Sequence, residues 1–125
     1  MKSQKQFILD TLLPYKEDPK TCAIDDDRCE YLTEDGRMCA VGKHMKKGKW
    51  QESKFNLSVR AISDCYGLEK ALKKSALKQN FTIEQWGYIQ SYHDYVATRW
   101  SDTLINEEVE KLEESLNIDL TELKF

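Results

Sequence analysis

The sequence predicts an α+β fold: a single, mainly helical domain over residues 1–125, with a small antiparallel β-hairpin packed on a long helix in the C-terminal half. Two patterns predict it. Apolar residues recur at spacings of three and four over most of the chain, which is typical of amphipathic helices. An Asp-Gly pair between two short runs of β-prone residues is typical of a hairpin turn. The length is sufficient for one core and favours one domain.

Seven elements follow from these patterns. They are a helix over about 3–13, a hairpin over about 28–40, and helices over about 40–47, 56–66, 68–79, 82–100 and 103–116. The first helix is expected to end at Pro14, whose ring and missing N–H disfavour continuation. Asp35 and Gly36 form the hairpin turn, because glycine accepts the positive φ that such turns require. The helix after the hairpin ends near Gly48, and Gly42 within it indicates the close approach of another backbone segment.

The second half of the chain is expected to be helical throughout. The longest helix begins with a capping box at Thr82, in the sequence Thr-Ile-Glu-Gln. Its core-facing stripe includes Gln90 and His93 at positions where apolar residues are expected. Because buried polar groups need partners, these two side chains should hydrogen-bond to other parts of the fold. After Trp100, the pattern allows either a separate helix or a continuation of the long one.

Composition argues against several classes of protein. The chain has 19 Lys and Arg against 22 Asp and Glu, a formal net charge of −3, which argues against a general nucleic-acid-binding protein. The apolar stretch near the N-terminus is too short for a signal peptide or a membrane span. We therefore expect a cytoplasmic protein without membrane association, whose four cysteines stay reduced. The sequence implies no cofactor, and it leaves the oligomeric state open.

A zinc site is one chemical interpretation of the cysteines. Cys22, Cys29, Cys39 and His44 are of the ligand types that zinc prefers. Their spacings lack the short paired knuckle of most structural zinc sites, so the sequence does not favour this interpretation.

A cysteine nucleophile is another interpretation. Cys39 would attack, His93 would act as base, and Asp94 or Gln90 would orient the imidazole. Consecutive helical residues point about 100° apart, which makes Asp94 an awkward partner for His93. No catalytic signature surrounds the cysteine. The interpretation we favour is a packed joint, in which Cys39 is a small core residue and Gln90 and His93 tie the hairpin to the long helix.

Two charged segments are candidate contact surfaces for a partner protein. The first is basic and carries an aromatic side chain, and it consists of Lys43, Lys46, Lys47, Lys49 and Trp50. The second is the acidic face of the last helix, with Glu107, Glu110, Glu113 and Glu114. A basic patch with an aromatic neighbour can also bind a nucleotide or RNA.

Three motifs follow one another along the chain: Cys-x-Tyr before the turn, Gly-x-x-Cys-Ala-Val-Gly after it, and Gln-x-x-His-Asp on the long helix. Their residues are Cys29, Tyr31, Gly36, Cys39, Ala40, Val41, Gly42, Gln90, His93 and Asp94. Together these motifs resemble small proteins encoded by bacteriophages and prophages. The resemblance covers about residue 22 to residue 100. It implies a phage accessory protein acting in the cytoplasm of the bacterial host, and it implies no particular activity.

The resemblance, together with the small size and the lack of a catalytic signature, favours a non-enzymatic phage protein. Such a protein would bind a host bacterial protein and inhibit or redirect it, as in host takeover or counter-defence. The alternative is a protein that binds or processes a nucleotide-like small molecule in a pocket between hairpin and long helix. Its ligand-binding residues would be Tyr31, Gln90, His93 and Asp94. A deep polar pocket there would favour the alternative, and a filled interface would favour protein binding.

Overall fold

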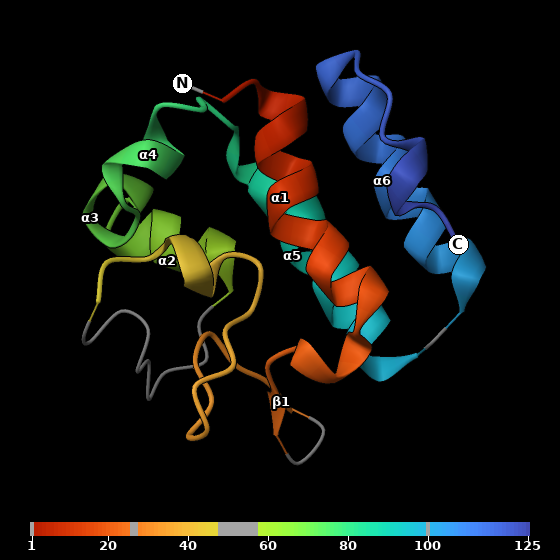
Figure 1. Cartoon of the computed structure of the whole chain (residues 1–125). Coiled ribbons are helices and arrows are strands. Elements are labelled where there is room, and N and C mark those ends of the chain that lie inside the picture. The colour runs from red at the N-terminus through yellow and green to blue at the C-terminus, as the bar shows by residue number, and fades with distance from the viewer. Residues whose placement is uncertain (1, 26–27, 48–57, 100) are drawn as a thin grey trace.

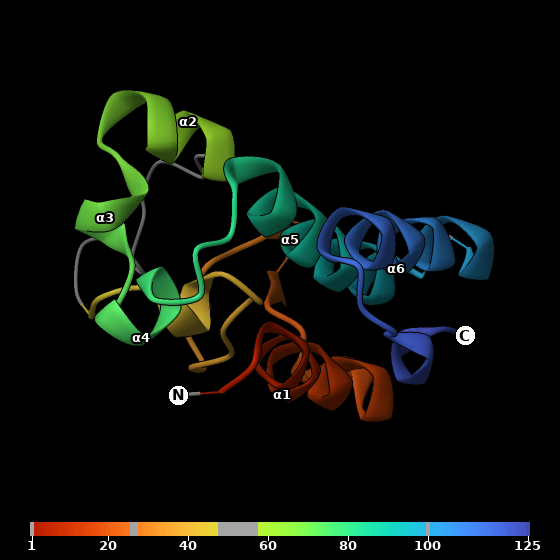
Figure 2. The ribbon, with the colours of Figure 1, turned by 90° about the horizontal axis from the view of Figure 1, so that it is seen from above.

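The computed structural model describes residues 2–25, 28–47, 58–99 and 101–125. Its α-helices are α1 (Gln4–Glu17), α2 (Val59–Cys65), α3 (Leu68–Ala71), α4 (Lys74–Leu77), α5 (Ile83–Thr98) and α6 (Asp102–Leu116). Three short 3-10 helices are η1 (Pro19–Thr21), η2 (Gly42–His44) and η3 (Thr121–Leu123). The central helix is α5, which contacts α1, α2 and α6. In Figures 1 and 2, α2, α3 and α4 gather at one end of the molecule and α6 lies at the other.

The prediction of an α+β fold with a β-hairpin is wrong, because the described residues form a mainly helical fold without a β layer. In the segment expected to form the hairpin, 28–40, the turn at Gly36 is closed by a single isolated bridge between Leu32 and Met38. The other extended pairings among the described residues are an isolated bridge between Met45 and Leu72 and the two-residue strands β1 (Ile24–Asp25) and β2 (Arg28–Cys29), which are too short to form a β layer.

Side chains from the helices take the place of a second strand in this loop. The Tyr15 hydroxyl on α1 donates to the carbonyl oxygen of Met38 at 2.5 Å. The Val41 N–H donates to Gln90 Oε1 on α5 at 3.0 Å. Because these backbone groups already have partners, the loop is anchored to the helices without a strand ladder.

Gly42 lies where two parts of this loop cross. A Cβ at Gly42 would collide with the carbonyl oxygen of Tyr31. The close backbone approach predicted for this glycine is therefore confirmed.

The helix α1 continues through Pro14 to Glu17, beyond the predicted end near residue 13. Proline removes the hydrogen bond to the carbonyl group four residues earlier, at Asp10. Both Pro14 and Asp10 are exposed, so water can satisfy that carbonyl group.

Two other helices are shorter than predicted, for a shared reason. The segment expected to be helical over 40–47 forms only the turn η2, and the helix expected over 68–79 is divided into α3 and α4. The Lys46 N–H donates to Ala71 O, and the Lys73 N–H donates to His44 O, both at 2.8 Å. This pairing between distant segments uses backbone groups that a continuous helix would need.

The long C-terminal pattern consists of two helices. α5 begins at the predicted capping box, in which the Gln85 N–H donates to Thr82 Oγ1 at 3.1 Å and Gln85 Oε1 accepts from the Thr82 N–H at 2.9 Å. Arg99 adopts a left-handed conformation, with φ of 55°, and Ser101 caps α6 through the Leu104 N–H. Trp100, at the end of the predicted range, lies outside the described residues.

No helix in the described parts of the chain combines the length and the apolar character needed to cross a membrane.

Candidate functional site

His93 lies at the centre of a buried polar joint between α5 and the loops. Its side chain is fully buried, and its ring meets the Tyr15 ring edge-on at 4.7 Å between centroids. Nε2 accepts the Ala23 N–H at 3.0 Å, so the proton of the neutral imidazole is on Nδ1, which donates to Asp94 Oδ1 at 2.8 Å. The adjacent Asp94 thus does orient the imidazole, despite the angular offset expected on a helix.

Gln90 extends the same network to a second loop. Its Oε1 accepts the Val41 N–H at 3.0 Å, and its Nε2 donates to Asp94 Oδ1 at 2.8 Å. The expectation that Gln90 and His93 hydrogen-bond to distant segments is confirmed. Among the described residues, every buried side-chain nitrogen or oxygen has a hydrogen-bond partner, so the joint is closed.

The Cys39 thiol gives no support to the nucleophile interpretation. It is completely buried, and its Sγ accepts the Gly42 N–H at 3.1 Å. Burial raises the pKa of the Cys39 thiol to about 12, so the neutral thiol predominates at neutral pH. Both nitrogens of His93 are engaged elsewhere, which leaves Cys39 without that base.

The predicted zinc ligands are not brought together where the structure describes them. His44 donates from Nε2 to Thr11 Oγ1 at 2.8 Å, whereas the Cys22 sulfur lies 4.0 Å from the His93 carbonyl oxygen. Over the described residues, no group of three or more His, Cys, Asp or Glu side chains could hold a metal ion. The side chain of Cys29 lies outside the description.

A pocket of about 510 Å³ lies beside the joint, between residues 30–31, the start of α2, and helices α5 and α6. Three of the four predicted ligand-binding residues line it: Tyr31, Gln90 and Asp94. His93 does not, because it is buried behind Asp94. The structure therefore places three of these residues at one pocket and the fourth behind its wall, and their role in binding a ligand stays a prediction.

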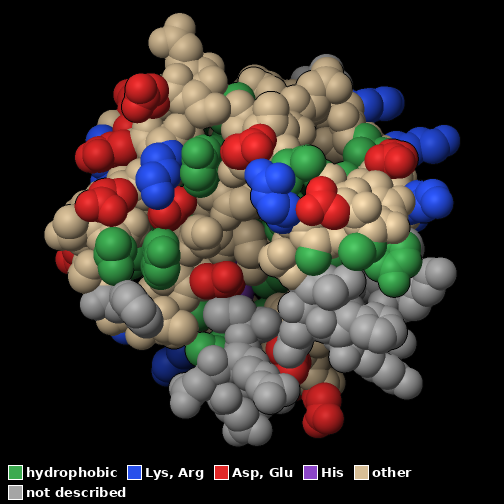
Figure 3. Space-filling model, turned by 180° about the vertical axis from the view of Figure 1, so that it is seen from behind, with side chains coloured by type: hydrophobic (Ala, Val, Ile, Leu, Met, Phe, Trp, Pro, Cys, Tyr) green, Lys and Arg blue, Asp and Glu red, His purple; other side chains and the backbone are tan. Residues whose placement is uncertain are grey.

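The lining of this pocket is negatively charged. Its charged members are Glu30, Glu84, Asp94, Glu108, Arg60 and Lys111. Arg60 pairs with Glu84 at 2.9 Å, and Lys111 pairs with Glu108 at 3.0 Å. Among the residues of the lining that the structure describes, no cation is left to pair with the carboxylates of Glu30 and Asp94. Figure 3 shows the molecule from this side, with acidic side chains gathered over α6.

Gly87 is a pocket residue that sequence reasoning missed. It lies in the middle of α5, where a Cβ would meet nothing within 4 Å. Glycine inside a helix costs roughly 1 kcal/mol relative to alanine, and no neighbour among the described residues requires it here. The sequence did hold a signal for this pocket residue, because Gly87 lies one turn before Gln90 and two turns before Asp94 on the same face of the helix.

The basic segment is only partly available to a partner. Lys43 donates to the Thr11 carbonyl oxygen at 3.0 Å and lies 4.2 Å above the Tyr15 ring, so it belongs to the packing of α1. Lys46 and Lys47 are exposed, while Lys49 and Trp50 lie outside the described residues.

The acidic segment is mostly exposed on α6. Glu107, Glu110 and Glu114 face solvent. Glu113 instead accepts the Leu120 N–H at 2.8 Å and pairs with Lys124 at 3.1 Å, so it holds the C-terminal segment against α6.

Comparison of the chain with protein-family models, with curated proteins and with solved structures finds no match.

Proposed function

We propose that the protein is a non-enzymatic phage accessory protein that binds a host protein and inhibits or redirects it, and that the pocket beside Asp94 receives a basic side chain of that partner. The phage origin rests on the resemblance of the sequence motifs. The binding role rests chiefly on one observation, the negatively charged pocket, whose floor includes a glycine that packing does not require.

The chemistry of the pocket suits a lysine or arginine side chain. Such a side chain has an apolar stem and a cationic head. Val59, Ile83 and Tyr88 offer apolar lining for the stem, and Asp94 and Glu30 offer carboxylates for the head. The exposed carboxylates of α6 extend the same charge beyond the pocket and would attract a basic segment at long range.

A nucleotide-like ligand is less well suited to this pocket. Phosphate groups need cationic or N–H donors, and they would meet two carboxylates without compensating charge. Arg60 and Lys111, the two cations that the structure describes in the lining, are already paired with glutamates. The pocket has the size of a small-molecule site, but its charge favours a cation.

Variants at Gly87 test the role of the pocket. The probe is an acetylated, amidated Arg-Lys-Arg peptide, with a Glu-Glu-Glu peptide as the charge control. NMR signals of the His93 imidazole report binding, because its Nδ1 is bonded to Asp94 in the pocket wall. We expect the basic peptide to shift these signals in the wild-type protein and in Gly87→Ala, but not in Gly87→Phe, whose ring fills the cavity. Equal shifts in Gly87→Phe, or an equal response to the acidic peptide, would contradict the proposal.

The same pair of variants tests the link to a host partner. The tagged protein is expressed in bacteria, and bound proteins are cross-linked and identified. A host protein cross-linked through a lysine or arginine segment should be captured by wild type and Gly87→Ala and lost with Gly87→Phe. Undiminished capture by folded Gly87→Phe would exclude the pocket as the contact.

A further inference from the structure

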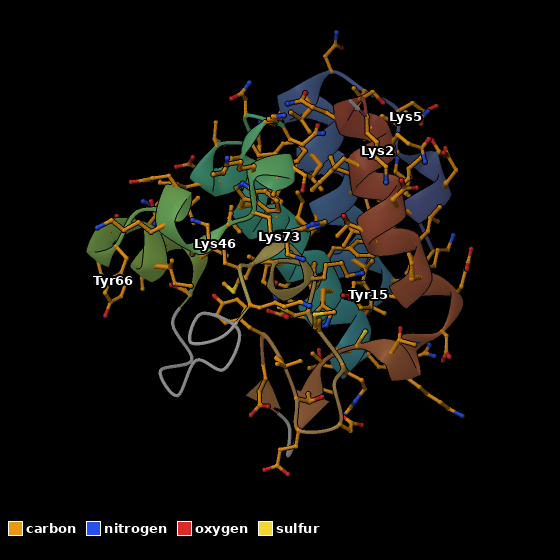
Figure 4. All side chains as sticks on the ribbon, turned by 60° about the vertical axis from the view of Figure 1, so that its left-hand side comes forward. Lys2, Lys5, Tyr15, Lys46, Tyr66 and Lys73 are labelled. Carbon is orange, nitrogen blue, oxygen red and sulfur yellow. The ribbon has the colours of Figure 1, made fainter. Side chains whose placement is uncertain are left out.

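A second pocket, of about 570 Å³, lies on a different face, where α1, η2 and the segment from α4 to Gln79 meet. Three lysines line it: Lys2, Lys43 and Lys78. The carboxylate in its lining, Asp10, already pairs with Lys2 at 2.6 Å. Figure 4 shows that the basic character extends around the pocket, since Lys2, Lys46 and Lys73 all lie on the face in view.

Lys43 is a partly buried cation in this pocket. Its Nζ donates to the Thr11 carbonyl oxygen, and it forms no ion pair with any side chain that the structure describes. Burial lowers the pKa of Lys43, which reflects the cost of removing its charge from water. An anion placed beside it would offset that cost.

His44 lies in the wall of this pocket, close to positively charged lysines. The Thr11 hydroxyl donates to Phe7 O at 2.8 Å, so the imidazole must donate from Nε2 to Thr11 Oγ1. Burial, reinforced by Lys43, Lys73 and Lys2, lowers the pKa of His44 to about 4. These three lysines therefore place positive charge near the neutral ring.

We infer that this pocket binds a small phosphorylated ligand, a phosphate monoester whose anionic group lies between Lys43 and Lys78, which form no ion pair with a described side chain, whereas Lys2 stays paired with Asp10. Lysine is a common point-charge partner for phosphate oxygens. The cavity is within the usual range for small-molecule sites and far larger than a phosphate ion alone, so an organic part would occupy the rest. Ser75 and Gln79 add neutral polar groups to the lining. The inference is independent of the acidic pocket and of the partner proposed for it.

The two histidines of the chain allow a direct test. Adenosine 5′-monophosphate, adenosine and inorganic phosphate are titrated separately while the imidazole NMR signals are followed. We expect the monophosphate to shift the His44 signals and to raise the pKa of His44 above about 4, because a nearby anion favours imidazolium. Inorganic phosphate should bind more weakly, adenosine should leave His44 unchanged, and His93 should not respond. No His44 response to either phosphate compound, or an equal response to adenosine, would overturn the inference.

Charge variants separate the pocket from the basic surface around it. Lys43→Met and Lys78→Gln should each weaken monophosphate binding about tenfold. The matched control is Lys70→Gln, which removes one exposed charge from α3 outside the pocket, and it should change affinity less than about twofold. Ser75→Trp, at an exposed site in α4, should block binding without removing a charge, and thermal unfolding checks that each variant folds.

Binding of an oligonucleotide tests whether the lysines form a general polyanion-binding surface instead of a small-ligand pocket. If a single-stranded oligonucleotide binds more tightly than the monophosphate, and Lys70→Gln weakens it as much as Lys78→Gln does, then the face is a polyanion surface. That result would refute a small-ligand pocket.

Discussion

At the scale of single residues, the two histidines are held in opposite neutral tautomers. His93 carries its proton on Nδ1, because Nε2 accepts a backbone N–H, whereas His44 carries it on Nε2, because the Thr11 hydroxyl is already used as a donor. Each ring joins a loop to a helix. Protonation of His44 would add a charge to a ring that is mostly removed from water.

The pKa of His44 predicts a loss of stability in acid. In the unfolded chain the ordinary value is about 6.5, and burial lowers it to about 4 in the fold. Above pH 6.5 both states are neutral and the full stability is present. Between pH 6.5 and 4 the unfolded state gains the proton first, so His44 should cost about 2–3 kcal/mol of the free energy of unfolding.

Urea unfolding at a series of pH values measures this loss. His44→Gln keeps a donor for Thr11 but does not titrate, so its stability should fall less between pH 6.5 and 4. A wild-type protein and a variant with parallel pH profiles would contradict the assignment.

The different burial of the cysteine thiols predicts the order in which they react with an alkylating reagent. Cys65 is exposed, whereas Cys22 and Cys39 are buried and burial raises the pKa of each to about 12. In a Cys29→Ser background, iodoacetamide should modify Cys65 in the native protein and the other two only after unfolding. Mass spectrometry of timed samples measures this. Native labelling of Cys39 as fast as that of Cys65 would reopen the nucleophile interpretation.

At the scale of elements, the two faces of α5 have different surroundings. One face packs into the core through residues such as Trp86, Ile89 and Val96, while Gly87, Ser91 and the polar side chains beside them line the acidic pocket. A helix stabilised only by packing has no need of an interior glycine facing open space.

Gly87→Ala should therefore stabilise the fold by roughly 0.5–1 kcal/mol, since alanine has the higher helix propensity and its Cβ meets no neighbour. Chemical denaturation of both proteins measures the difference. Gly42→Ala provides the contrast, because its Cβ collides with the Tyr31 carbonyl group, and it should destabilise the protein. Destabilisation by both substitutions would show that Gly87 is required by packing.

Local patterns predicted those elements that depend on local interactions. The capping box at Thr82 and the polar positions Gln90 and His93 are read directly from residues a few positions apart. The hairpin was predicted wrongly and two helices were predicted too long, because groups distant in sequence take the hydrogen bonds that these elements would need. The Lys46 N–H, for example, donates to Ala71 O. The pocket was anticipated beside Asp94, but its charge depends on where α2 and α6 pack, which no local pattern records.

At the scale of the whole molecule, charged side chains are unevenly distributed. Acidic side chains are frequent on α6, which carries red side chains in Figure 3, and lysines are frequent on and beside α3, α4 and η2, where Figure 4 labels Lys46 and Lys73. The formal net charge of −3 is therefore spread unevenly over the surface.

The C-terminal segment is part of the core of the molecule. Leu120 and Leu123 are fully buried, and the Tyr92 hydroxyl on α5 donates to Leu123 O at 2.8 Å. Lys16 on α1 donates to the carbonyl oxygens of Glu122 and Lys124 at 2.9 and 2.7 Å. This segment thus connects the first helix to the last two.

Leu123→Ala should destabilise the protein by about 2–4 kcal/mol, because it leaves a cavity at a site enclosed by three helices. Glu122→Ala is the matched control, since that side chain is exposed and only its backbone is used. Thermal and urea unfolding measure both. Equal stabilities of the two variants would mean that the segment does not contribute to the core.

The crossing of Gly42 over Tyr31 also has an evolutionary consequence. No side chain fits at that crossing, so any descendant that keeps the loop path must keep glycine there, however far the rest of its sequence diverges. A search for distant kin can therefore require glycine eleven residues after the tyrosine, with glutamine and the His-Asp pair later on one helix. Such a pattern is defined by geometry, and it remains detectable after overall similarity has been lost.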